Sequence, residues 1–219
     1  MLPLEFHVLL DSKTGRLNLP PKVENDDWTK LDFHKCDHCP LDSKKEDYCP
    51  AAVGLGHLVD AFRDMKSFWK CRITVTTTER SYVKNADVQS GLFSLFGLIM
   101  ASSGCPHLDF LRPMARFHLP FSNVMETVVR AISMYLLSQY FKAKRGGQPD
   151  ITLNQVDKLY KNVNKVNQGI LARICEVGKG DSKYNAVVVL DTFAFILKNE
   201  LSNDLSIVKD IFEQSYKNN

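Results

Sequence analysis

Hydrophobic and polar residues follow two different periods along this chain, and the change falls near residue 85. Before it, Leu4 to Leu9 and Arg16 to Leu19 alternate as strands do and flank SKTG, whose Gly15 can adopt a positive φ, so we predict a hairpin. Residues 28 to 33 and the β-branched stretch 71 to 83 alternate in the same way. We expect these segments to pair in an antiparallel sheet of about four strands.

Helical spacing of apolar residues dominates the rest of the chain. One helix is expected before residue 85, because Pro50 suits the first turn of a helix. After residue 85, the apolar run 87 to 103 predicts a core helix that ends at Gly104 and Pro106. Capping-box patterns in NVME and TLNQ predict the starts of two longer helices. The helices expected in this part of the chain span 87–103, 123–143, 152–175, 184–200 and 205–216.

These patterns predict an α+β protein. A small N-terminal antiparallel sheet should pack on a C-terminal bundle of about five helices. We expect one globular domain over residues 1–219, with a β-rich part in 1–84 and a helical part in 85–219, because no linker or repeat separates the two parts. The stripe of apolar residues on helix 152–175 is interpreted as core rather than as a dimer interface.

Composition and charge say more about the compartment and partners of the protein than about its activity. The chain has 219 residues, 44% of them hydrophobic, and 28 basic against 25 acidic residues, so no nucleic-acid partner is expected. The N-terminus lacks the features of a signal peptide, and the apolar run 88–101 is shorter than the ~20 residues of a membrane span, so we expect a cytoplasmic protein without a membrane partner. In that compartment the six cysteines should be reduced.

The candidate chemistry is concentrated in FHKCDHCPLDSKKEDYCP, residues 33 to 50. Cys36 and Cys39 have the spacing that lets two thiolates bind one metal from a tight turn, and Cys49 is a third ligand. Cys105, which like two of the others precedes a proline, is the preferred fourth ligand. The alternatives are Cys71, His34, His38, His107 and His118.

Two kinds of metal centre are compatible with these candidate ligands. Zinc accepts both cysteine-rich and mixed cysteine and histidine sites, whereas iron–sulfur clusters prefer four thiolates. The first hypothesis is therefore a metal-binding protein whose cysteine cluster holds zinc or an iron–sulfur cluster and has a structural or redox-sensing role. A thioredoxin-like pair is disfavoured, because a polar loop rather than a helix follows Cys39.

A second hypothesis concerns residues 103 to 130. The cationic side chains of Arg112, Arg116 and Arg130 are candidates to bind a small acidic ligand, with His118 as a proton carrier and Glu126 nearby. A structural interpretation is preferred: Glu126 and Arg130 form a helix ion pair, and Arg116 and His118 bind loop carbonyls. No catalytic residue is assigned.

Two further possibilities remain. Cys105 could act as a nucleophile beside His107 or His118, but the end of the preceding helix should raise its pKa and oppose thiolate formation. The chain could also be an adaptor that binds a protein partner, or a second copy of itself, through its C-terminal helices.

The block ERSYVKNADVQSGLFSLFGLIMASSGCPHLDFLRPMARFHLPFSNVMETVVRAISMYLLSQY, with the upstream HCPLDSKKEDYCPAA, resembles an uncharacterised bacterial protein family that is described as a domain of unknown function. The resemblance covers about the middle half of the chain and implies a bacterial cytosolic protein. It implies no activity, substrate or site residue.

Overall fold

The structure is a computed structural model of the chain. It describes residues 3–18, 27–62, 64–177, 194–197, 199–201 and 203–216. The elements in these ranges are η1 (Asp27–Thr29), α1 (Pro50–Ala61), β1 (Lys70–Thr76), β2 (Ser81–Asp87), α2 (Val88–Ser102), η2 (Asp109–Leu111), α3 (Arg112–Arg116), α4 (Val124–Lys144), α5 (Val156–Val177) and α7 (Ser206–Tyr216).

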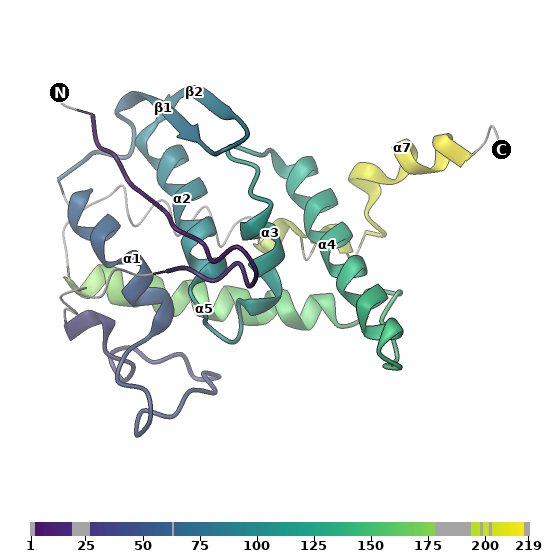
Figure 1. Cartoon of the computed structure of the whole chain (residues 1–219), viewed down its shortest axis with the longest axis horizontal. Helices are drawn as coiled ribbons and strands as arrows, with labels where there is room; N and C mark the ends of the chain where they lie inside the picture. Colours follow the sequence, from purple (N-terminus) through teal and green to yellow (C-terminus); the bar gives the residue numbers. More distant parts are fainter. Residues whose placement is uncertain are drawn as a thin grey trace.

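The long helix α5 runs across the molecule below α2 and α3 (Figure 1). Helices α1 and α2 lie above one end of α5, and the β1–β2 hairpin lies above α2, while α4 and α7 form the opposite end of the molecule. The loop that joins η1 to α1 lies below α1, at the far end from α7. A mixed α and β architecture with a small antiparallel sheet is therefore present.

The sheet differs in detail from the four strands predicted. In the described residues it has two strands, β1 and β2, which pair with each other from Lys70 opposite Asp87 to Thr76 opposite Ser81. The stretch 71–83, predicted as one strand, is instead most of a hairpin. Its turn forms because the Thr77 backbone N–H and hydroxyl both donate to the carbonyl of Arg80, which a β-branched pattern alone does not reveal.

The other predicted strands are reduced to single bridges. Leu10 pairs with Leu17 across a turn in which Gly15 has a φ of +68°, so the turn was predicted correctly but no extended strands flank it in the described residues. The segment predicted as a strand at 28–33 forms the 3₁₀ helix η1 and a turn, with one bridge from Lys30 to Tyr48. Burial of Trp28 and Leu31 accounts for the apolar alternation.

Side-chain caps fix the starts of the helices. Asp87 accepts the Ser90 N–H at the start of α2, and Asn123 and Glu126 form the predicted capping box of α4. The box predicted in TLNQ is wrong: the carboxylate of Asp150 accepts the N–H groups of the two residues before α5. The predicted helix 184–200 lies largely outside the described residues, although residues 194–197 and 199–201 are helical.

One hydrophobic core joins the two parts of the chain. It contains side chains from η1, α1, α2, α4 and α5, among them Trp28, Leu55, Phe96, Val128 and Ile170. The apolar stripe of α5 belongs to this core, as predicted, since Val156, Val163, Val166, Ile170 and Ile174 are all buried. None of the helices in the described ranges combines the length and apolar character needed to cross a bilayer.

Candidate metal centre

The cysteine-rich loop is closed at its base by backbone hydrogen bonds. The Leu31 N–H donates to the carbonyl of Asp47 (2.8 Å), and the Cys49 N–H donates to the carbonyl of Thr29 (2.8 Å). A tight turn, in which the Cys39 N–H donates to the Cys36 carbonyl (2.9 Å), places the CxxC pair on the same loop. Cys49 returns the chain to α1 as the residue that precedes its first turn.

Helix α5 offers a glycine where the loop approaches it. A Cβ at Gly169 would lie 2.6 Å from Cys36 Sγ, so only a residue without a side chain allows the thiol this position. The sulfur of Cys36 therefore lies directly against α5, at about the middle of the helix.

Cys105 reaches the same region from the turn that follows α2. Its thiol is buried and lies within electrostatic range of Cys49 and Cys36, and Cys36 in turn lies within range of Cys39. The structure thus brings together the four cysteines that we selected from the sequence. Their role as ligands remains a prediction.

A buried arginine completes the cluster. The guanidinium of Arg173, on α5, is 1% exposed and lies within electrostatic range of Cys49, Cys36 and Cys39. It donates to the carbonyls of Trp28 (2.5 Å), Lys30 (2.7 Å) and Leu31 (3.0 Å), so it also holds the start of the loop against α5. In the ranges that the structure describes, no acidic side chain forms an ion pair with it.

Two of the four thiols are protonated at pH 7. Burial raises the pKa of the Cys105 thiol to about 12. Burial, together with the neighbouring Cys49 and Cys39, raises the pKa of Cys36 to about 11. The elevated pKa of Cys105 thus agrees with our expectation, but its main cause is burial rather than the end of the preceding helix. Neither thiol is activated as a nucleophile.

The thiols are gathered but not yet arranged as a coordination shell. Among the described residues, no three histidine, cysteine, aspartate or glutamate side chains are placed so that they could hold a metal ion as they stand. A metal centre here therefore needs the thiols to move together. Cys36 and Cys39 lie on a loop, where such a movement needs no change in a helix or strand.

Two of the alternative histidine ligands lie beside the cluster and stack on each other. The rings of His38 and His107 are 4.0 Å apart, and their Nε2 atoms donate to the backbone carbonyls of Asn162 (3.2 Å) and His38 (2.7 Å), respectively. These bonds leave Nδ1 of His38 unprotonated, and it is buried without a hydrogen-bond partner in the described structure. His38 is therefore the histidine best suited to replace a thiol.

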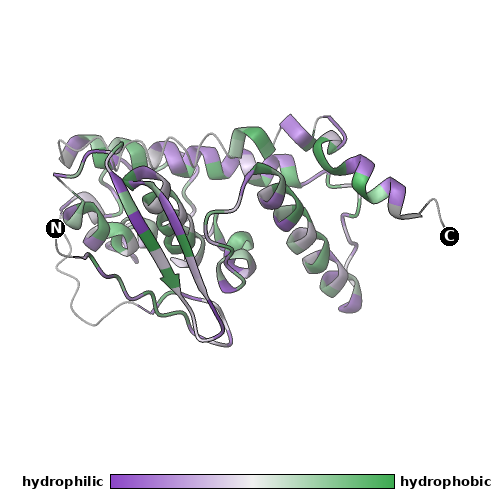
Figure 2. Cartoon of the chain, turned by 90° about the horizontal axis from the view of Figure 1, so that it is seen from above, coloured by the Kyte–Doolittle hydropathy of each residue, from purple (hydrophilic) through white to green (hydrophobic). Residues whose placement is uncertain are grey.

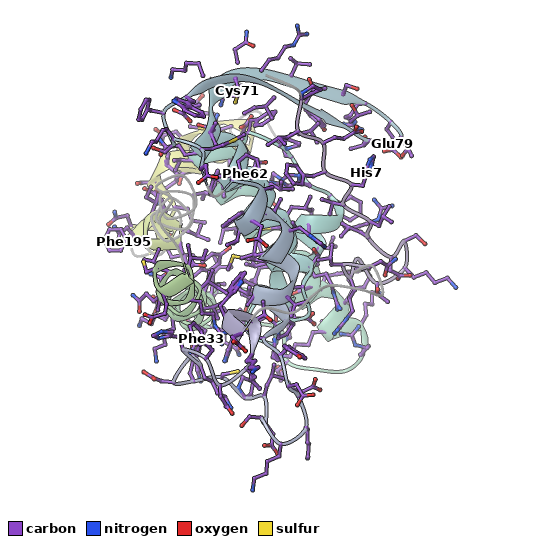
Figure 3. All side chains as sticks on the ribbon, turned by 90° about the vertical axis from the view of Figure 1, so that its left-hand side faces the viewer. His7, Phe33, Phe62, Cys71, Glu79 and Phe195 are labelled. Carbon is purple, nitrogen blue, oxygen red and sulfur yellow. The ribbon has the colours of Figure 1, made fainter. Side chains whose placement is uncertain are left out.

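The remaining alternatives lie elsewhere. Cys71 is on β1, at the end of the molecule opposite Phe33, as Figure 3 shows. His34 is exposed, and its Nε2 lies 3.9 Å from Oε2 of Glu176. The Nε2 atom of His118 lies 3.4 Å from Oγ of Ser94 on α2. Cys175, which is not one of the candidate ligands, is exposed.

Arg112 and Arg116 of the proposed anion-binding set occupy α3. Arg112 forms an ion pair with Asp109 (3.2 Å), which also lies 3.7 Å from Arg16. Arg116 is exposed and lies over the ring of Phe117 (5.7 Å). The positive charge of Arg112 is therefore matched by a carboxylate of the protein itself.

The other members of this set have structural contacts. Arg130 donates to two backbone carbonyls at the end of α3 (3.2 and 2.8 Å), the role expected of Arg116 and His118. Glu126 serves the capping box with Asn123 rather than the expected ion pair. Burial, and secondarily Arg130, lowers the pKa of His118 to about 4, so the ring is neutral at pH 7.

Sequence reasoning missed Arg173 and Gly169. Arg173 lies seven residues after Val166, which places both on nearly the same side of α5, so a charged residue within the apolar stripe was the available signal. The sequence signal for Gly169 was weaker. Glycine in the middle of a helix is unfavourable, so its presence there indicates that another group approaches the helix closely. Asn167, on the same helix, is a buried polar residue that sequence reasoning also missed.

The fold and the cluster define a mixed α and β protein in which thiols from separate segments lie near a buried arginine. The family described as Domain of unknown function (DUF6901) matches residues 2–213, so the chain belongs to this family. Comparison with curated proteins and with solved structures finds no match.

Proposed function

We propose that this protein binds a metal centre through Cys36, Cys39, Cys49 and Cys105. The observation that carries the proposal is the convergence of Cys36, Cys39 and Cys49 on the buried guanidinium of Arg173, with Cys105 within electrostatic range of Cys36 and Cys49. No acidic side chain pairs with this guanidinium in the described structure. Four thiolates suit either zinc or an iron–sulfur cluster. Deprotonation on metal binding would replace neutral thiols by negative ligands beside an existing positive charge.

A structural role is the better-supported one. The centre would connect the loop before α1 to the turn after α2, since Cys105 follows Cys49 by more than fifty residues. Metal binding that closes a long loop restricts the unfolded chain and so stabilises the fold. Sensing through free thiols would need exposed thiolates, whereas the raised pKa values of Cys36 and Cys105 keep these two protonated.

Metal analysis of anaerobically purified protein tests the proposal. We expect one metal centre per chain, lost in Cys36→Ser and Cys105→Ser but retained in the matched controls Cys71→Ser and Cys175→Ser. Iron with sulfide and visible absorption would identify a cluster, and colourless zinc would identify a mononuclear site. Protein that is metal-free after expression with added zinc or iron, and that binds neither on reconstitution, would refute the proposal.

The second candidate function, association through the C-terminal helices, is favoured by a specific feature of α4 and α7. On the side of α4 away from the core, Leu137, Tyr140 and Phe141 are each about half exposed (49–53%). Helix α7 extends away from the body (Figure 2) and carries Ile211 at 61% exposure. Both helices thus present apolar residues outside the core.

We propose a second copy of the chain as the partner for these helices. The C-terminal end of α4 is basic, with Lys144 and the following Arg145 exposed, whereas α7 exposes the acidic Asp210. Glu213 of α7 is already paired with Lys209 (3.9 Å). Because each copy carries both surfaces, α7 of one can meet α4 of the other reciprocally, as a two-fold dimer requires.

The mass of the protein in solution tests this association. By light scattering during gel filtration, wild type and the control Val83→Glu, which changes an exposed residue on β2, should have the mass of a dimer. Leu137→Glu and Ile211→Glu should have the mass of a monomer. A wild-type protein that is monomeric at all concentrations up to about 100 μM would contradict the proposed dimer.

A further inference from the structure

The positive charge of Arg173 is unusual because it is buried among neutral groups. The side chain is 1% exposed, and all of its described hydrogen bonds go to neutral backbone carbonyls. Removing a cation from water costs several kcal/mol after relaxation unless an anion compensates it. In the described part of the chain, the ionisable groups that act on the guanidinium are Cys49, Cys36 and Cys39.

The missing anion would be present if the thiols bound a metal. A divalent metal held by four thiolates carries two net negative charges, and a four-thiolate iron–sulfur cluster is likewise anionic. The hydrogen bonds to the carbonyls of Trp28, Lys30 and Leu31 fix the guanidinium at the start of the loop that carries Cys36 and Cys39. Arg173 is therefore positioned before any metal arrives.

We propose that Arg173 is the counter-charge of the metal–thiolate centre, a positioning residue that sets the affinity of the centre for metal. This inference rests on the proposed function. It names a centre that is anionic overall, with thiolates rather than neutral histidines as its main ligands. Replacing such an outer residue typically weakens metal binding 10–100-fold.

Three variants separate charge from hydrogen bonding. Arg173→Met removes both, Arg173→Lys keeps the charge but not the planar fork, and Arg116→Met is the control because Arg116 is exposed on α3. The affinity of each reduced, metal-free protein for Zn²⁺ is measured by competition with a chromophoric chelator, with circular dichroism as the check of folding.

We expect Arg173→Met to bind Zn²⁺ at least about tenfold more weakly than wild type, and Arg173→Lys and Arg116→Met to stay within about threefold of it. Folded Arg173→Met with wild-type affinity would overturn the inference. If Arg173→Met does not fold, Arg173→Lys decides: a loss of about tenfold despite the retained charge would assign the effect to hydrogen bonds and overturn the inference as well.

Metal binding by the wild-type protein distinguishes failure of the proposed function from failure of the inference about Arg173. Wild type that binds no metal removes the proposed function, whereas wild type that binds metal independently of the charge at position 173 removes only the inference. If the native centre is an iron–sulfur cluster, loss of the positive charge should lower its midpoint potential, because the reduced cluster is the more negative form. A purely structural role of Arg173 would leave that potential unchanged.

Discussion

At the residue scale, the contact between Gly169 and Cys36 shows how the helix admits the loop. Glycine is a poor helix former, so its presence in the middle of α5 lowers the stability of the helix. The space that it leaves is occupied by the sulfur of Cys36. The position of this thiol therefore depends on the absence of a side chain at residue 169.

Alanine substitutions at two helical glycines should have opposite effects. Gly56→Ala, on α1, meets no atom within 4 Å and should raise the free energy of unfolding by about 0.5–1 kcal/mol. Gly169→Ala should lower it by about 1 kcal/mol, because its Cβ would meet the sulfur at 2.6 Å. Urea denaturation measures both. Equal stabilisation by the two variants would show that the thiol does not need the space at Gly169.

His118 should make the protein sensitive to mild acid. Its pKa is lowered from 6.5 to about 4 by burial, so the unfolded chain binds a proton there at a higher pH than the folded one. Its contribution to stability is therefore complete above pH 6.5 and is lost as the pH falls toward 4. Between pH 7 and pH 5 the loss should be about 2 kcal/mol.

The matched pair His118→Gln and His7→Gln checks this dependence by urea denaturation at both pH values. His118→Gln should lose less stability than wild type on acidification. His7→Gln should behave as wild type, because the His7 side chain is 79% exposed. An unchanged pH dependence in His118→Gln would mean that another group is responsible.

At the element scale, Asp150 joins the start of α5 to α4. Its carboxylate accepts N–H groups from Asn154 (3.1 Å) and Gln155 (2.7 Å) and the hydroxyl of Tyr135 (2.8 Å). Its own N–H donates to the side chain of Gln139, also on α4 (3.0 Å). These bonds, that of Gln155 foremost, hold the pKa of Asp150 below its usual 3.8.

Asp150→Asn should lower the free energy of unfolding at pH 7 by about 1–2 kcal/mol. Because the folded pKa is the lower one, the contribution of the carboxylate is present above pH 3.8 and disappears as the pH falls through the folded value. The difference between wild type and variant should therefore narrow in acid. Denaturant titrations at pH 7 and pH 3 measure it, with the exposed Asp64→Asn as a control that should stay within about 0.5 kcal/mol of wild type.

The helices were predictable because their signals are local. The capping box of Asn123 and Glu126, Pro50 at the start of α1 and Gly104 after α2 each act within a few residues of their own position. The sheet was not predictable in this way, because the pairing of a strand depends on partners that can be distant in sequence. The two halves of the stretch 71–83 pair with each other in one hairpin. Residues 28–33 therefore have no strand of this sheet as a partner and pack as a 3₁₀ helix and a turn instead.

At the scale of the whole molecule, the candidate site joins segments that the sequence keeps apart. The cysteines were identifiable from their spacing, and Cys105 from its likeness to the others. The residues that receive them, Gly169 and Arg173, come from a helix more than sixty residues further along the chain. Their involvement depends on how α5 packs, which no local pattern encodes.

If the proposed metal centre forms, removing its metal should lower the thermal stability of the entire chain. A metal present at about 1,000 times its dissociation constant stabilises the folded state by about 4 kcal/mol. For a protein of this size that corresponds to a decrease in Tm of roughly 8–16 °C on chelation. Differential scanning fluorimetry with and without chelator measures it.

The cysteine variants provide the controls for this decrease. Cys105→Ser should melt at the lower temperature with or without chelator. Cys175→Ser should follow wild type, because its thiol is exposed on the far part of α5. An identical decrease in Cys105→Ser and wild type would place the stabilising metal elsewhere.

The hydrogen bonds of Arg173 also have a consequence for synthesis on the ribosome. They join residues separated by 142 to 145 positions, so Trp28 and Leu31 leave the ribosome long before α5 exists to cover them. At typical rates of translation this interval is roughly 7–30 s. During this interval the loop with Cys36, Cys39 and Cys49 exists without the helix that carries Gly169 and Arg173.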